Sequence, residues 1–439
     1  MAFLGPEPHA RVLREVPNMS IKQRLYHDDS HLEMMRVHCG HARFIWNLAL
    51  EQRQMYRKDR DFKPSVVSQA KELSELRKEI DWLRAGASTV QQQALRDLDR
   101  AYQHWWSNPK HFSPPKPRSI KDQSQGFYVR DLSLTRLSKK WATIFLPKIG
   151  PVRFRLTRSW TEVKACKSAR VTVTKSGQWH VSFTSAPQLF ERQETGVILG
   201  IDRGVTQTIA TSEGGFDKIP SLTEGEIKRF LFLEQQFSRQ VNGSKRRERT
   251  RVKLAKLREK LSRRKLDWVE KTTTQLVREN DVLVLEKLLV RNMVKAPAPK
   301  PDPENEGQYL PNGARAKAGL NRVIHASCWG MLLQRLQDKA GMTPETDKTR
   351  IVLVDPRNTS RECNSCGHTA AENRESQAVF ECVKCGHAAN ADTNAARNIL
   401  DRGVNNETIL PLVERLMDAG VPSRARRYQN VKHQELATA

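Results

Sequence analysis

Two pairs of cysteines at equal spacing are the clearest chemical signature of this chain of 439 residues. Cys363 and Cys366 form one Cys-x-x-Cys-Gly-His hook, Cys382 and Cys385 form a second, and fifteen residues separate the two hooks. Four thiolates at this spacing can converge on one tetrahedral Zn²⁺ ion, and the glycine after each hook allows the positive φ that the turn needs. A redox role suits a single Cys-x-x-Cys better than two hooks. We therefore expect one structural Zn²⁺ ion held by the four cysteines.

Three acidic residues stand at the edges of apolar segments. Asp202 ends the run VILGID, Glu286 ends VLVLE, and Asp392 follows the last cysteine by seven residues at the start of a helix-forming run. An isolated aspartate at a helix start is more often an N-cap or a first-turn acid. Three such acids favour a shared site, because divalent cations make clustered carboxylates tolerable. Oxygen ligands suit Mg²⁺ or Mn²⁺ and the chemistry of phosphodiester cleavage.

Four motifs in a fixed order carry a family resemblance. GIDRGV, VLVLEKLLVRNM, DPRNTSRECNSCG and ANADTNAARNIL resemble the TnpB proteins of insertion sequences and the related compact type V CRISPR effectors. Those proteins are RNA-guided DNA nucleases with a RuvC-like, RNase H-type domain and an inserted zinc ribbon. The resemblance covers nearly the whole chain and is most specific in the C-terminal half. It implies that Asp202, Glu286 and Asp392 hold two Mg²⁺ (or Mn²⁺) ions and that guide RNA and target double-stranded DNA are the partners.

Two departures from the family pattern keep a second function open. Arg203 stands where an apolar residue usually follows the first aspartate, and Ala391 replaces the arginine that usually precedes the third acid. An altered charge beside the metals would weaken cleavage without abolishing binding. The alternative is therefore an RNA-guided DNA-binding protein with weak or no cleavage. A strand-joining transposase ranks last, because it rests on the shared fold alone.

The charge of the chain points to the same partners. A formal net charge of +26 predicts a polyanion partner, for which nucleic acid is the usual identity. Twelve Lys or Arg and two Glu lie between Lys245 and Lys265, without acids in the run to pair with them, so we expect phosphate contacts. The arginines chosen as nucleic-acid-binding residues are Arg246, Arg247, Arg263 and Arg264.

Composition also indicates the cellular compartment. The chain has no apolar run of bilayer length and no signal-peptide pattern, so we expect no membrane partner. Its seven cysteines suggest no disulfide framework and suit a reducing compartment. The expected location is the prokaryotic cytoplasm, in association with the nucleoid. A homodimer is compatible with the sequence.

The predicted fold class is multidomain α+β, with an RNase H-like (RuvC) mixed α/β domain, an inserted zinc ribbon, a small β-barrel wedge domain and an inserted helical recognition domain. The expected boundaries are residues 1–30 and 125–190 for the wedge barrel, 31–124 for the helical domain, 191–354 for the RuvC-like domain with basic helices and a lid loop, 355–390 for the ribbon, 391–403 for the last RuvC motif and 404–439 for a tail. The barrel closure and the lid are implied by the resemblance alone.

Local patterns complete the expected elements. Three prolines in HFSPPKPRSIK, residues 111–121, predict a boundary loop, and residues 295–319 predict a long loop without periodicity. A helix is expected over residues 323–340. Among the N-terminal helices, Arg43, Trp46, Asn47, Trp105 and Trp106 could stack on bases, although core packing is the preferred role for the two adjacent tryptophans.

Overall fold

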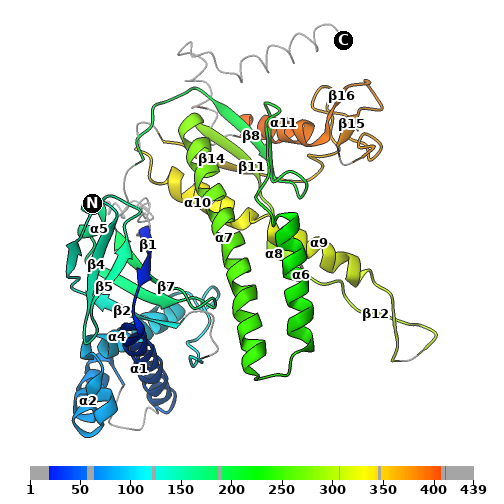
Figure 1. Cartoon of the computed structure of the whole chain (residues 1–439). Helices are drawn as coiled ribbons and strands as arrows, with labels where there is room; N and C mark the ends of the chain where they lie inside the picture. Colours follow the sequence, from blue (N-terminus) through cyan, green and yellow to red (C-terminus); the bar gives the residue numbers. More distant parts are fainter. Residues whose placement is uncertain are drawn as a thin grey trace, which may run out of the picture. The chain divides into compact units, whose positions relative to one another are not determined.

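The chain forms two compact units (Figure 1). The computed structural model describes residues 19–56, 64–120, 125–185, 190–305, 307–344, 348–376, 378–406 and 411. The N-terminal unit comprises the described residues of Pro17–Pro187 and Lys228–Glu259, and the C-terminal unit comprises those of Gln188–Ile227 and Lys260–Ala439. The segment 228–259, which we expected within the RuvC-like region, thus groups with the N-terminal unit. The expected tail after residue 406 lies almost wholly outside the described residues.

A seven-stranded antiparallel sheet organises the N-terminal unit. Its order is β2-β6-β7-β1-β5-β4-β3. The strands are β1 (Met19–Tyr26), β2 (Gln125–Arg130), β3 (Leu134–Arg136), β4 (Trp141–Leu146), β5 (Gly150–Arg155), β6 (Ser168–Val173) and β7 (Trp179–Ser185), with a short helix α5 (Trp160–Lys164). Alternate side chains such as Val152 and Phe154 enter the core, as expected when one face of a sheet is buried. Because β1 pairs with both β5 and β7, the helices between β1 and β2 are an insertion into the sheet.

The inserted helices are α1 (Asp29–Gln54), α2 (Val66–Glu79), α3 (Asp81–Ala85) and α4 (Ser88–Ser107). Asp28 caps α1 by accepting a hydrogen bond from the main-chain N–H of His31. Further along α1, the indole of Trp46 donates to the carbonyl of Lys116, and Asn47 exchanges two hydrogen bonds with the main chain of Arg118. Trp46 and Asn47 therefore hold the proline-rich segment on α1. This structural role replaces base stacking for these two residues.

A five-stranded sheet of order β10-β9-β8-β11-β14 forms the centre of the C-terminal unit. Its strands are β8 (Ile198–Asp202), β9 (Ile209–Thr211), β10 (Phe216–Asp217), β11 (Val282–Glu286) and β14 (Arg350–Val354). The first three strands form an antiparallel meander, and β11 runs parallel to both β8 and β14. This arrangement is the RNase H-like topology expected from the sequence. Both faces of the sheet are covered, which explains why VLVLE is apolar throughout.

Helices supply the two covering layers. The last helix, α11 (Ala391–Val404), packs Ile399 and Leu400 against one face, and α10 (Trp329–Ala340) packs Leu332 and Leu336 against the other together with the end of α7 (Lys245–Glu279). Gly200 in β8 allows α11 to approach closely, because a Cβ at this position would lie 2.2 Å from the carbonyl oxygen of Ala396. Figure 1 shows α11 in orange beside β8.

Two expectations for the region after β11 need correction. Residues 295–319 are not structureless, because they contain the short strands β12 (Lys300–Pro301) and β13 (Tyr309–Leu310) and the start of α9 (Ala314–Ala326). The helix expected over 323–340 is interrupted at Cys328, which adopts a left-handed conformation with φ of 54° between α9 and α10. The remaining elements are α6 (Glu224–Arg239), α8 (Val290–Met293), β15 (Val379–Glu381) and β16 (Ala388–Asn390).

No helix in the part of the chain that the structure describes combines the length and apolar character that crossing a bilayer requires.

Candidate functional site

The three acids predicted from the sequence lie in the C-terminal unit at the ends of adjacent elements. Asp202 ends β8 and Glu286 ends β11, and these strands are parallel neighbours whose registered pair Leu285 and Ile201 immediately precedes the acids. Asp392 lies in the first turn of α11, the helix that packs on β8. A Cβ on Gly204 would lie 4.0 Å from Oδ2 of Asp392, so the loop after Asp202 reaches the third acid.

Asp392 is not the N-cap of its helix. Asn390 takes that role, since its side-chain oxygen accepts hydrogen bonds from the main-chain N–H groups of Asp392 and Thr393. The carboxylate of Asp392 is therefore free of the capping duty that an isolated aspartate at this position would most often perform. Its side chain is 15% exposed.

Burial raises the pKa of all three acids, and the other two acids add to the rise at Asp202. Burial, followed by the negative charges of Glu286 and Asp392, raises the pKa of Asp202 to about 7. Burial also raises the pKa values of Glu286 and Asp392. Asp202 is therefore partly protonated near neutral pH, and a bound divalent cation would favour its charged form. In the described residues, the four cysteines are the one group of three or more potential ligands whose atoms all lie within 4.8 Å, so the acids are gathered less tightly.

Two arginines that the sequence did not mark as site residues pair with the acids. Arg203 is 4% exposed and donates a hydrogen bond to the main-chain carbonyl of Glu286. Arg374, from the segment between the two cysteine hooks, donates to Oδ1 of Asp392 at 3.3 Å. Thr359 donates its hydroxyl to Oε1 of Glu286 at 2.6 Å, which opposes the effect of burial on the pKa of that acid.

The four predicted zinc ligands converge. Their Sγ atoms lie within 4.8 Å of one another, and the structure places Cys363 opposite Cys385 at 3.7 Å and Cys366 opposite Cys382 at 3.6 Å. Gly367 and Gly386 adopt φ values of 72° and 69°, as the hooks require. The cluster can therefore hold one metal ion, and four thiolates at this distance fit tetrahedral Zn²⁺.

Buried asparagines connect this cysteine cluster to the helix that carries Asp392. Asn394 accepts from the main-chain N–H of Asn364 and donates to the carbonyl of Glu362, and Asn398 donates to the carbonyls of Thr359 and Glu362. These contacts explain why the run ANADTNAARNIL carries asparagines at helix positions. A change at the cysteines should therefore reach the acidic site.

The basic run occupies the first two-thirds of α7, and the structure divides its four predicted arginines into two pairs. Arg264 makes two hydrogen bonds to Glu226 of α6, and Arg247 donates to the carbonyls of Phe237 and Gln240 at the end of α6. The expectation that no acids match this run is wrong, because Arg251 pairs with Glu248 inside the run. Arg258 pairs with Glu234 of the preceding helix, and Lys260 and Arg264 pair with Glu226 of the same helix. Arg246 and Arg263 are exposed, and the described residues offer neither guanidinium a hydrogen-bond or ion-pair partner.

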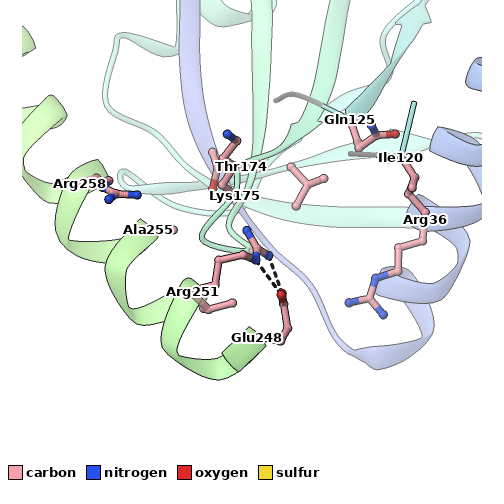
Figure 2. Close-up of a pocket in the computed structure, with 12 residues that line it drawn as sticks. Arg36, Ile120, Gln125, Thr174, Lys175, Glu248, Arg251, Ala255 and Arg258 are labelled. Carbon is pink, nitrogen blue, oxygen red and sulfur yellow. Dashed lines mark hydrogen bonds and ion pairs between the residues drawn. The ribbon is translucent and has the colours of Figure 1, made fainter. Parts of the chain in front are cut away.

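A basic cavity of about 700 Å³ lies between α7 and the turn that joins β6 to β7, within the N-terminal unit (Figure 2). Arg36, Lys175, Arg251 and Arg258 line it, and its one acid, Glu248, is already bonded to Arg251. Figure 2 shows these cations arranged around the opening. Arg258 pairs with Glu234 of α6, so Arg36 and Lys175 are the lining cations that no acid among the described residues pairs with, and their charge suits a phosphate backbone.

Comparison with known proteins adds family information over most of the chain. Family models match at residues 18–61 ("Helix-turn-helix domain" of OrfB_IS605), 171–296 (OrfB_IS605, "Probable transposase") and 329–399 ("Cas12f1-like, TNB domain"). The "Putative RNA-guided DNA endonuclease InsQ" of Escherichia coli (strain K12) is 32% identical over 84% of this chain and 88% of its own length. A "Putative RNA-guided DNA endonuclease" of Streptomyces pristinaespiralis is 27% identical over 88% of this chain and 89% of its own length. The "CRISPR-associated endodeoxyribonuclease Cas12f1" of Sulfoacidibacillus thermotolerans is 45% identical over 15% of each chain.

Proposed function

This chain belongs to the family of TnpB-type compact RNA-guided nucleases, and from that premise we propose that it is an RNA-guided DNA endonuclease. It binds a guide RNA, pairs that RNA with one strand of target duplex DNA, recognises a short flanking motif and hydrolyses phosphodiester bonds. The observation that carries the proposal is the placement of Asp202 and Glu286 at the ends of β8 and β11 and of Asp392 at the start of α11. It is supported by the likeness of 84% and 88% of the chain to two relatives named "Putative RNA-guided DNA endonuclease".

The acidic site fits two Mg²⁺ or Mn²⁺ ions. Its donors are hard carboxylate oxygens, and burial together with repulsion from Glu286 and Asp392, which raise the pKa of Asp202 to about 7, would be offset by divalent cations. When bound, such ions would activate a water and stabilise the leaving oxygen of the phosphodiester. Other residues of the chain position the carboxylates. Thr359 orients the carboxylate of Glu286, and Asn390 fixes the first turn of α11 and thereby the position of Asp392.

The cysteine cluster would hold one structural Zn²⁺ ion rather than take part in the chemistry. Four thiolates leave no open position for a water or substrate. Through Asn394 and Asn398, the bound ribbon supports the helix start that carries Asp392 and presents Arg374 to that acid.

Guide RNA and target DNA would contact the basic surface of the chain. The exposed cations Arg246 and Arg263 on α7, and Arg36 and Lys175 of the cavity, supply charge that no acid among the described residues pairs with. A prokaryotic, cytoplasmic setting on the nucleoid follows from these partners, and a homodimer remains compatible with them.

The second function, RNA-guided DNA binding with weak cleavage, is favoured by one observation. Two arginines, Arg203 and Arg374, already neutralise part of the charge of the acidic site. Both would oppose the entry of divalent cations.

One experiment separates the two functions. The RNA that copurifies with the protein would be sequenced, and a plasmid containing the matching target beside randomised flanking sequence would be incubated with the complex and Mg²⁺. We expect linearised plasmid and a depleted flanking motif. Target binding in a gel-shift assay, without cleavage in Mg²⁺ or Mn²⁺, would establish the binding protein instead.

A further inference from the structure

The outer face of the sheet formed by β1, β5 and β4 carries an unusual set of side chains. Alternation along these strands buries one face and turns the other outward. The outward cations are Lys22, Arg24, Arg153 and Arg155, all exposed, and the described residues offer none of them a carboxylate within ion-pair distance. Cations without acids on a sheet surface indicate a polyanionic ligand.

Two aromatic rings lie among these cations. Tyr26 of β1 and Trp141 of β4 meet edge to face, with ring centroids 4.9 Å apart, and both side chains are half-buried. The guanidinium of Arg24 lies 5.1 Å from the centroid of Tyr26, and that of Arg153 lies 5.8 Å from the centroid of Trp141. The rings are therefore held in place by packing and still reach the surface. Aromatic rings flanked by arginines are the usual means of binding an unpaired base and its phosphates.

Three of these residues border a cavity of about 630 Å³, and Trp141 adjoins it through its contact with Tyr26. Arg24, Tyr26 and Arg153 line it together with His27, Asp28, His31 and Pro151. Asp28, whose side chain is 63% exposed, places a hydrogen-bond acceptor at the rim of an otherwise basic site. A carboxylate repels a phosphate but accepts a hydrogen bond from a ribose 2′-hydroxyl, which DNA lacks.

We propose that this cavity binds one unpaired nucleotide of the guide RNA. The base stacks against Tyr26 and Trp141, Arg24 and Arg153 contact the flanking phosphates, and Asp28 accepts from the 2′-hydroxyl. The identity of the RNA as the guide rests on the proposed function, whereas the site for an unpaired ribonucleotide rests on the cavity itself.

Titration of the full-length protein, freed of copurified RNA, tests the site. The probes are fluorescein-labelled oligouridylate of about twelve nucleotides and the matching oligothymidylate, a length within the usual range for single-strand sites. We expect Trp141→Ala to weaken oligouridylate binding roughly five- to hundredfold with an unchanged salt slope, because stacking releases no counterions. Arg153→Gln should make the slope shallower. Asp28→Asn should reduce the preference for RNA over DNA.

Controls distinguish the site from general basic attraction and from misfolding. Trp82→Ala removes an exposed tryptophan of α3, and Arg130→Gln removes an exposed arginine of β2 on the same sheet; both should bind like the parent. Trp141→Phe keeps a ring and should retain most of the affinity, even if Trp141→Ala fails to fold. Parental affinity in Trp141→Ala, or equal losses for RNA and DNA throughout, would overturn the proposal. Guided plasmid cleavage by the parent is scored separately, so a failure of the nuclease function is not mistaken for a failure of this site.

Discussion

Arg374 donates a hydrogen bond to Oδ1 of Asp392 at 3.3 Å, so the segment between the two cysteine hooks supplies a cation to the acid that follows them. Both side chains are largely buried, with exposed fractions of 27% and 15%. The contact opposes the rise in the pKa of Asp392 that burial causes. It also links the ribbon to the acidic site by charge, in addition to the asparagine contacts.

The first prediction concerns this contact. Arg374→Gln should tighten binding of Mn²⁺ several-fold, because a cation that competes with the metal for Asp392 is removed. Calorimetric titration of the metal-free protein measures the change, and Arg374→Lys, which keeps the charge, should bind Mn²⁺ like the parent. Weaker Mn²⁺ binding by Arg374→Gln would mean that Arg374 orders the site rather than competes for it.

The second prediction follows from the raised pKa of Asp202. Between the ordinary value of 3.8 and about 7, the folded protein keeps a proton that the unfolded chain has lost, so this group reduces stability progressively as the pH rises through that window. Asp202→Asn removes this cost. Without divalent metal, the variant should unfold at a higher temperature than the parent near pH 8 and at nearly the same temperature near pH 4. A parental unfolding temperature at both pH values would show that the charge repulsion is relieved by other means.

The sequence was sufficient for features that depend on local patterns. Apolar runs located β8 and β11, and the cysteine spacing predicted a cluster that the structure brings together. The strand-end positions of Asp202 and Glu286 were likewise readable, because the two runs are short, apolar and end in an acid.

The contacts made by distant side chains could not be read in this way. An arginine directly after a strand end is usually exposed, but Arg203 is buried. It donates to the main-chain carbonyl of Glu286, which is 83 residues away in the sequence. The basic run of α7 seemed unmatched because Glu226, which pairs with Arg264, lies 38 residues upstream on another helix. The apolar periodicity predicted one continuous helix, but the positive φ of Cys328 interrupts it. Periodicity carries no information about backbone φ.

The third prediction separates the two pairs of arginines on α7. Replacing exposed Arg246 and Arg263 by glutamine should leave the unfolding temperature unchanged and reduce the salt slope of duplex binding by about 1.8, if each contacts one phosphate. Replacing Arg247 and Arg264 should instead lower the unfolding temperature, because Arg264 holds Glu226, whose pKa it lowers to about 2 with Lys260. Identical behaviour of the two double variants would contradict this division.

The fourth prediction concerns the cysteine cluster. Cys363→Ser should release the metal ion and lose cleavage, because three thiolates cannot replace the folding free energy of four and because the ribbon supports α11 through Asn394 and Asn398. Metal analysis of the purified protein and the plasmid assay measure the two effects. Cys328→Ser, which lies outside the cluster, should retain zinc. Parental protein without zinc would exclude a structural Zn²⁺ ion.

The last prediction distinguishes metal ligation from a structural role at the three acids. Asp202→Ala, Glu286→Gln and Asp392→Asn should each bind guide RNA and target DNA like the parent and cleave at background, because each removes a negative ligand from a site that must hold two cations.

Asp392→Asn is the decisive variant, because Asn390 already caps α11 and the amide preserves the shape of the side chain. A structural Asp392 would lose only its pairing with Arg374, a contribution of about 1 kcal/mol or less to stability, and would leave the rate nearly unchanged. If Asp392 is a metal ligand, the Asp392→Asn variant should lose most of its cleavage rate, because each ~1.36 kcal/mol of lost transition-state stabilisation lowers the rate tenfold. Rates of plasmid cleavage in Mg²⁺, measured beside target binding by the same preparations, decide between the two. Cleavage by Asp392→Asn at the parental rate would remove Asp392 from the metal site and leave Asp202 and Glu286 as its only acids among the three.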